Sequence, residues 1–74
     1  MTQKQLILRY MQEGREISPL DALREFGCFR LGARIHELRQ DGWNVVSRLH
    51  SYKNHYGQAK TFALYHLAGT EVRP

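Results

Sequence analysis

The sequence predicts an α+β fold in which three short helices are followed by a two-stranded β-hairpin. Apolar residues recur every three or four positions in three segments before residue 42, as in helices that bury one face. Beyond that residue, aromatic and β-branched residues flank a turn-prone segment at 54–58, as in a hairpin. A chain of 74 residues has room for one small core, so we expect one domain over 1–68 and a flexible tail over 69–74.

The first helix is predicted over residues 3–13. Thr2 is placed to cap its first turn, and Gly14 stands where a helix commonly ends. One face of this helix therefore belongs to the core. The apolar stripe on that face consists of Leu6, Ile7, Tyr10 and Met11.

The second helix has the clearest start signal in the chain. Ser18 is a preferred N-cap residue, Pro19 suits the first helical position, and the carboxylate of Asp21 is favoured near the positive helix end. Gly27 is the residue type that most readily ends a helix in the left-handed region. Between these limits, one face of the helix is lined by Leu20, Leu23 and Phe26.

The third helix is predicted over residues 29–40. Its apolar positions are Leu31, Ile35 and Leu38, which are spaced four and three residues apart. The pattern stops at Gly42, a residue type that commonly follows a helix. Because the turn that separates it from the second helix is short, the two helices form a helix-turn-helix.

Three residues at the start of this helix need an explanation. Cys28 stands where Ser, Thr, Asp or Asn would cap the helix, and we expect it to be a small buried residue. Gly32 costs about 1 kcal/mol relative to alanine inside a helix. We expect it to permit close packing on the second helix, the alternative being close approach of DNA to the backbone. Phe29 is expected to be buried, the alternative being contact with a thymine methyl group.

The hairpin is predicted to occupy residues 43–67. Its first strand contains Trp43, Val45, Val46, Leu49 and Tyr52, and its second strand runs over 61–67. Ile17, just before the second helix, is placed to supply a short third strand.

Composition and charge restrict the function. Lys and Arg number 11 against 7 Asp and Glu, and the resulting net charge of +4 favours a polyanionic partner. The single cysteine excludes an internal disulfide and a cysteine-rich zinc site. No apolar run approaches the roughly 18 residues of a membrane span, and the N-terminus lacks a signal peptide, so we expect a cytoplasmic protein without membrane association.

No enzyme activity, cofactor or metal site is predicted. The candidate acid, base or metal-binding groups are scattered carboxylates and the histidines His36, His50, His55 and His66. None of them has the spacing of a catalytic or metal-binding motif.

The most specific pattern lies between residues 18 and 39. It reads Ser18-Pro19-Leu20-Asp21-Ala22-Leu23, then Phe26-Gly27, then Arg30-Leu31-Gly32-Ala33-Arg34-Ile35-His36-Glu37-Leu38-Arg39. Together with the hairpin, this order resembles the winged helix-turn-helix family over residues 3–67. It is most similar to the small helix-turn-helix domains of phage and prophage proteins. The resemblance implies that 29–40 is a recognition helix in the major groove of DNA, and that the hairpin loop is a wing on neighbouring backbone or minor groove.

The outward face of the recognition helix is predicted to hold Arg30, Ala33, Arg34 and Glu37. This follows if the apolar positions of the helix face the core. Arginine pairs well with O6 and N7 of guanine, so Arg30 and Arg34 are the expected base-reading residues. The alternative is that Arg30, Arg34 and Arg39 only solvate the helix face and pair with Glu37.

The hairpin is basic, which supports a contact with DNA. No acidic residue lies between Asp41 and Glu71. Contacts with the backbone or the minor groove are predicted for the start of the second helix and for the wing, over 53–60. The predicted contact residues are Ser18, Arg48, Lys53, Asn54, His55 and Lys60. The alternative is a solvated hairpin whose lysines prevent strand-to-strand aggregation.

We therefore predict a sequence-specific protein that binds double-stranded DNA, a transcriptional regulator of phage or prophage type. We expect a monomer in solution that pairs on DNA. One alternative is a protein-binding module, such as a small phage inhibitor of host machinery, in which Trp43, Tyr52 and Tyr56 would form the interface if exposed. The other is an excisionase-like architectural protein that bends DNA.

Overall fold

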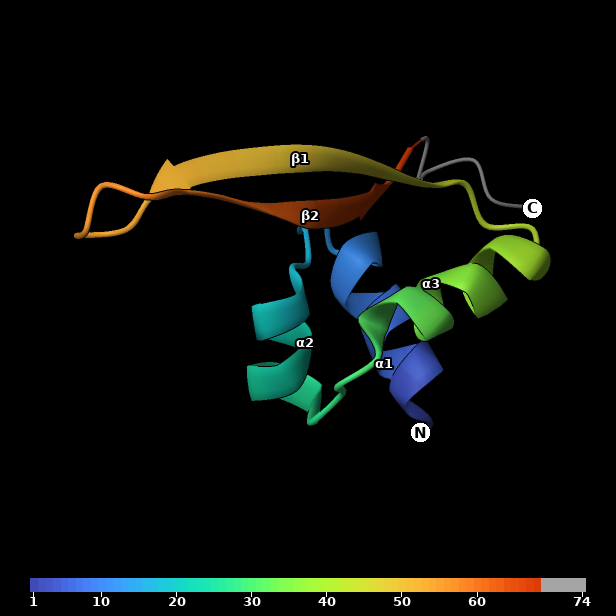
Figure 1. Cartoon of the computed structure of the whole chain (residues 1–74). Coiled ribbons are helices and arrows are strands. Elements are labelled where there is room, and N and C mark those ends of the chain that lie inside the picture. Colours follow the sequence, from blue (N-terminus) through green and yellow to red (C-terminus); the bar gives the residue numbers. More distant parts are fainter. Residues whose placement is uncertain (69–74) are drawn as a thin grey trace.

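The computed structural model describes residues 1–68 and has the predicted order of three helices and a hairpin (Figure 1). The elements are α1 (Gln3–Gln12), α2 (Pro19–Phe26), α3 (Leu31–Gln40), β1 (Val45–Lys53) and β2 (Ala59–Leu67). The helices form a body under one end of the hairpin, and this order confirms the predicted α+β class. The predicted tail at 69–74 lies outside the described residues.

Helices α1 and α2 begin at caps made by neighbouring residues. Thr2 Oγ1 accepts a hydrogen bond from the Gln5 amide at 3.2 Å, and the Gln5 side chain accepts one from the Thr2 amide at 2.8 Å. Ser18 and Asp21 exchange the same two bonds, both at 3.0 Å. Gly27 ends α2 with φ at 64°, in the left-handed region. Both caps and this helix end are as predicted, and α1 ends one residue earlier than predicted.

Helix α2 packs on the core through a different face from the one predicted. Ala22 is fully buried, whereas Leu20 is 59% exposed and Leu23 is 38% exposed. Of the three predicted residues only Phe26 packs against the core, where its ring meets that of Tyr10 edge-on at 5.7 Å. The small side chain of Ala22 lets the helix backbone approach its neighbours, and this orientation turns the two leucines toward solvent.

The turn between α2 and α3 corrects three expectations. Cys28 is 2% exposed, as predicted, but Phe29 is 86% exposed, so its predicted burial is wrong. The Cys28 amide donates to the Ala22 carbonyl at 3.0 Å, which folds Cys28 back onto α2 and directs the next residue outward. Helix α3 consequently begins at Leu31, two residues later than predicted. Arg30, not Cys28, is the N-cap residue, and its side chain makes no capping hydrogen bond.

The core lies between the three helices and the base of the hairpin. Its buried residues are Ile7, Met11, Ile17, Ala22, Cys28, Leu31, Ile35, Leu38, Val45 and Leu67. All three apolar positions predicted for α3 belong to it. The side chains of α3 that point away from this core are therefore available to a partner.

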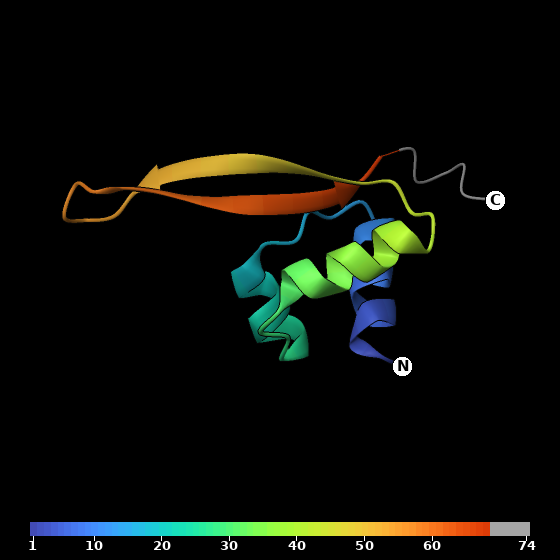
Figure 2. The ribbon, with the colours of Figure 1, turned by 45° about the vertical axis from the view of Figure 1, so that its right-hand side comes forward.

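The hairpin is much longer than the part of it that the helices cover. Strands β1 and β2, with nine residues each, pair antiparallel in continuous register. Ile17 adds the predicted short bridge, with two hydrogen bonds of 2.9 Å to Tyr65. Val45 and Leu67 at the base are buried, but β1 is exposed from Ser47 onward. The outer hairpin therefore projects beyond the helices as a two-stranded arm (Figure 2).

Candidate nucleic-acid interface

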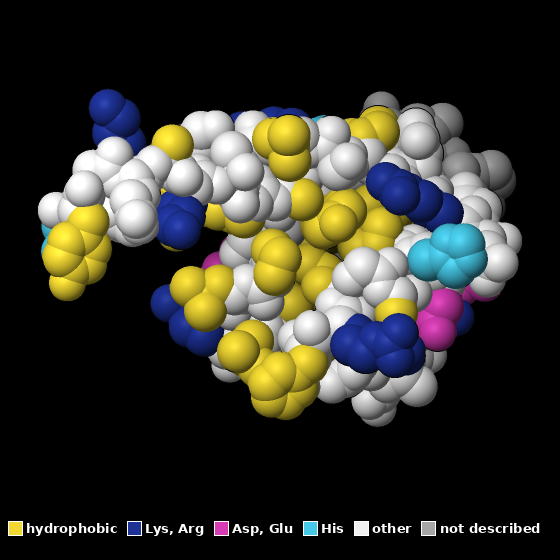
Figure 3. All heavy atoms as spheres, viewed as in Figure 1, with side chains coloured by type: hydrophobic (Ala, Val, Ile, Leu, Met, Phe, Trp, Pro, Cys, Tyr) yellow, Lys and Arg dark blue, Asp and Glu magenta, His cyan; other side chains and the backbone are white. Residues whose placement is uncertain are grey.

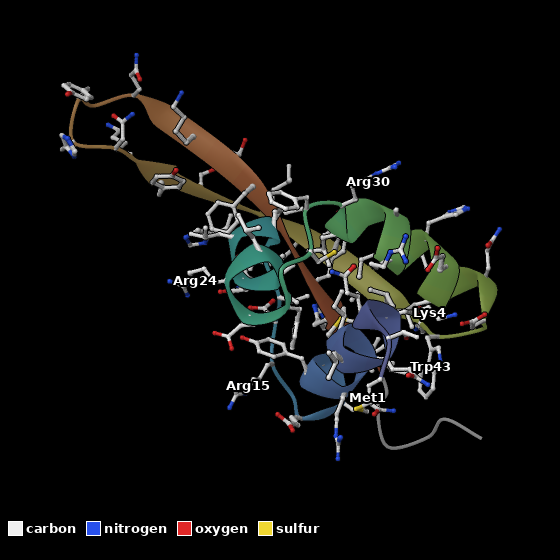
Figure 4. The ribbon with its side chains drawn as sticks, turned by 90° about the horizontal axis from the view of Figure 1, so that it is seen from below. Met1, Lys4, Arg15, Arg24, Arg30 and Trp43 are labelled. Atoms are coloured by element: carbon white, nitrogen blue, oxygen red, sulfur yellow. The ribbon has the colours of Figure 1, made fainter. Side chains whose placement is uncertain are left out.

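Helix α3 has an outer face opposite its buried stripe. With 3.6 residues per turn, Ala33, His36 and Gln40 lie on the side of the helix that faces away from the core. His36 and Gln40 are exposed, and Ala33 is half-buried. Arg30 stands at the start of this face and extends away from the helices (Figure 4). The face is therefore a polar row that begins with a cation.

Gly32 leaves the helix backbone open beside Arg30. A Cβ built on Gly32 would have no heavy atom within 4 Å. The prediction that this glycine permits close packing on the second helix is therefore wrong. The open backbone is compatible with the alternative, close approach of DNA to the helix.

Arg34 and Glu37 lie together on the flank of α3 that faces α1. Nη1 of Arg34 is 3.3 Å from Oε1 of Glu37, and the two side chains are 33% and 39% exposed. Lys4 of α1 reaches the same flank, where its hydrogen bond to Asp41, 2.8 Å long, raises the pKa of the lysine. Arg34 thus forms the ion pair with Glu37 that was predicted as the alternative to reading bases. Arg30, in contrast, has no ion pair within residues 1–68.

His36 and Gln40 are missing from the predicted interface, although their positions could have been identified. The predicted outward set was Arg30, Ala33, Arg34 and Glu37, which leans toward the α1 flank. Positions 33, 36 and 40 are three and four residues apart and out of phase with the buried positions 31, 35 and 38. This spacing alone places His36 and Gln40 opposite the core.

The outer end of the hairpin carries four of the predicted wing residues, Lys53 and Lys60 in the strands and Asn54 and His55 in the turn. Lys53, His55 and Lys60 are exposed. Asn54 is half-buried because it forms the turn, since its Oδ1 accepts the amides of the second and fourth residues after it at 2.9 and 3.1 Å. Two lysines and a histidine are therefore open to an anionic ligand, whereas Asn54 is engaged within the turn.

Arg48 is engaged in an ion pair with a residue from a distant part of the chain. Its Nε and Nη2 each donate to a carboxylate oxygen of Glu16 at 2.7 Å. The hydrogen bonds lower the pKa of Glu16 and raise that of Arg48. The Glu16 carboxylate also lies 3.7 Å from Nδ1 of His66. Strand β1 therefore has an acidic neighbour in space, and the guanidinium of Arg48 is already engaged with it.

Ser18 is also engaged within the protein. It is 7% exposed, and its Oγ accepts the amide of Asp21 at 3.0 Å. The first turn of α2 thus satisfies one of its free amides with its own side chain and carries a carboxylate nearby. The Ser18 cap leaves fewer free amides for a phosphate at this helix end, and the Asp21 carboxylate repels it.

Other kinds of site have less support in the structure. Within residues 1–68, no group of three or more His, Cys, Asp or Glu side chains could hold a metal ion. None of the helices in the described part of the chain is long and apolar enough to cross a membrane. Of the aromatic residues considered for a protein interface, Trp43 packs against the core, whereas Tyr52 and Tyr56 are 48% and 80% exposed.

Comparison with known protein families agrees with this geometry. A family model described as a winged helix-turn-helix domain matches residues 2–70. The match spans nearly the whole chain and confirms the resemblance seen in the sequence. Domains of this kind typically bind DNA and are not enzymes. No curated protein and no solved structure matches the chain.

Proposed function

Because this chain belongs to the winged helix-turn-helix family, we propose that it binds double-stranded DNA sequence-specifically, with the outer face of α3 in the major groove. The observation that carries the proposal is the row of Arg30, His36 and Gln40 along the open side of α3. All three side chains have hydrogen-bonding groups that can reach base edges. Arginine suits guanine and glutamine suits adenine, so the row can discriminate between bases.

Gly32 and Ala33 support this role because they are small. A helix can lie deep in the groove only where its side chains leave room between the backbone and the bases. The space around Gly32 is open, and the methyl group of Ala33 is suited to contact with a thymine methyl group. The two residues lie next to Arg30, where the helix would be closest to the bases.

The hairpin turn would supply affinity that does not depend on sequence. We assign contacts with phosphates or the minor groove to Lys53, His55 and Lys60, which are the exposed basic residues of the wing. Each phosphate neutralised by a lysine contributes about 0.9 to the slope of log affinity against log salt. Replacing Lys53 or Lys60 with alanine should therefore weaken binding to all duplexes alike and reduce that slope.

The biological role that fits these features is a transcriptional regulator of phage or prophage type. The resemblance of residues 18–39 to small domains of such proteins supports it. All three helices of the described domain contribute to its own core, which supports a monomer that pairs only on DNA. An excisionase-like role would differ by bending DNA, and circularly permuted duplexes would detect that bend.

The test of base reading is fluorescence anisotropy with a duplex selected from a random library. We expect Arg30→Ala to raise Kd for the selected duplex about 5- to 150-fold, the cost of a lost bidentate contact to a base. Arg34→Ala should have a smaller effect because Glu37 already holds the guanidinium. The matched control is Arg15→Ala, which removes the same charge from an exposed side chain far from Arg30 (Figure 4).

Two results would contradict the proposal in different ways. If Arg30→Ala and Arg15→Ala weaken selected and random duplexes equally, α3 does not read bases. If the protein binds no duplex even at low salt, the DNA-binding function is wrong, and a protein-binding module becomes the better explanation.

A further inference from the structure

A groove lies between the start of α2 and the outer hairpin, and the DNA interface proposed for α3 does not use it. It has a volume of about 610 Å³, and its lining residues are Ser18, Pro19, Leu20, His50, Tyr52 and Phe62. Hydrophobic side chains gather along this side of the molecule, from the hairpin down over α2 (Figure 3). The groove contains no residue of α3, so it is separate from the face proposed to read duplex DNA.

Three aromatic rings form the hairpin wall of this groove. His50 and Phe62 are direct partners across the two strands, and Tyr52 follows on the same face of β1. The ring of Phe62 lies 5.3 Å from that of His50 and 5.8 Å from that of Tyr52, with planes inclined by 54° and 61°. Rings at such angles meet tilted or edge to face and do not form a flat stack, and Phe62 is half-buried, so the ring faces that no neighbouring ring covers can take a planar ligand. Tyr52 is 48% exposed.

The charges around the groove favour an anionic ligand. Lys60 is exposed and lies directly opposite Tyr52, on the same face of the hairpin. The two acidic residues beside Ser18 are both neutralised. Both carboxylate oxygens of Glu16 accept hydrogen bonds from Arg48 of β1. The carboxylate of Asp21 accepts the Ser18 amide at 3.0 Å and lies 3.5 Å from Arg24. The groove therefore has a cation at its rim and no uncompensated carboxylate.

We propose that this groove binds unpaired bases of single-stranded nucleic acid, which stack on Tyr52 and Phe62 while Lys60 neutralises the adjoining phosphate. Aromatic platforms beside basic side chains are the usual means of binding single strands without sequence preference. In a duplex the base faces are covered by neighbouring base pairs, so only an unpaired base can use these rings. An apolar protein segment would also cover Leu20, but it would not use the cation or the flat ring faces.

The test is fluorescence anisotropy with labelled oligothymidylate of about ten nucleotides, within the range that single-strand sites occupy. Tyr52→Leu and Phe62→Leu keep an apolar side chain but remove the ring. Each should raise Kd for the oligonucleotide by at least about fivefold, the lower limit for losing one stacked base. Tyr10→Leu is the matched control, because it removes a ring that contacts Phe26 and Arg15 outside the groove. Circular dichroism would verify that all three variants fold.

Two further measurements distinguish RNA from DNA as the ligand and test whether a second copy of the chain occupies the groove. Oligouridylate of the same length distinguishes RNA from DNA as the source of the unpaired bases. The proposal is overturned if neither oligonucleotide binds, or if the two leucine variants bind them as tightly as the wild type. It is also overturned if sedimentation shows a dimer that Leu20→Asp dissociates, because the groove is then an interface with a second copy.

The outcome can be separated from that of the proposed function. Arg30→Ala should weaken duplex binding and leave oligothymidylate binding unchanged, whereas Tyr52→Leu should do the reverse. Loss of single-strand binding alone would leave the role of α3 intact. If the protein binds the oligonucleotide but no duplex, the proposal for the groove stands and the role proposed for α3 is refuted.

Discussion

Replacing Gly32 with alanine is expected to make the protein more stable and to weaken its binding to DNA. Gly32 lies in the first turn of α3 without a positive φ, and a Cβ there meets no heavy atom within 4 Å. Alanine therefore introduces no clash, and it reduces the freedom of the unfolded chain, which stabilises by about 0.4–1 kcal/mol. For a domain of this size, that gain corresponds to a rise in Tm of about 2–8 °C.

Gly27→Ala is the matched control for this stability measurement. The space around Gly27 is equally open, but its φ is 64°, where an L-residue with a Cβ costs roughly 1–2 kcal/mol. Thermal unfolding followed by circular dichroism should therefore give a higher Tm for Gly32→Ala and a lower Tm for Gly27→Ala. If Gly32→Ala lowers Tm, the argument from open space at this position is refuted.

The same two variants measure how closely DNA approaches α3. A methyl group at position 32 would stand between the helix backbone and the bases, so Kd for the selected duplex should rise although the fold is more stable. Gly27→Ala, measured well below its Tm, should leave that Kd unchanged. A duplex affinity that is unaffected by Gly32→Ala would show that DNA does not approach the backbone there.

Two further predictions concern contacts within the protein. Ser18→Ala removes a nearly buried hydrogen bond to the Asp21 amide, 3.0 Å long, and should cost about 1 kcal/mol in urea unfolding; an unchanged free energy of unfolding would show that the cap contributes nothing. The pKa of Glu16 is held below its ordinary value of 4.5 by the hydrogen bonds from Arg48. Its contribution to stability is therefore complete above that value and is lost as the pH falls through the lowered pKa. The stability advantage of the wild type over Glu16→Gln should shrink on acidification, and an advantage that stays constant down to low pH would contradict the ion pair.

Several features could be predicted because neighbouring residues encode them. The cap at Ser18 needs only Asp21, three residues away, and the end of α2 needs only a glycine that tolerates a positive φ. The order of helices and strands follows from the period of the apolar residues. The outer face of α3 was also predictable in outline, since the phase of Leu31, Ile35 and Leu38 determines it.

Other features depended on which elements meet in space. Whether Leu20 or Ala22 faces the core depends on how closely α2 approaches the other elements. The burial of Cys28 and the exposure of Phe29 depend on one hydrogen bond at the turn. Arg48 looked free in the sequence because its partner, Glu16, is 32 residues away. The rings of Tyr52 and Phe62 meet only through the register of the hairpin.

The sequence by itself thus determined the elements, their caps, the buried stripe of α3 and the basic character of the hairpin, because periodicity, capping and charge act over a few residues. Only the tertiary structure decided which charged groups stay free. It pairs Arg48 with Glu16, which is 32 residues away, and among residues 1–68 it leaves Arg30 and the two wing lysines exposed and without an ion pair. The reason is physical: a charge is available to a ligand only where no opposite charge reaches it, and that depends on the packing of distant segments.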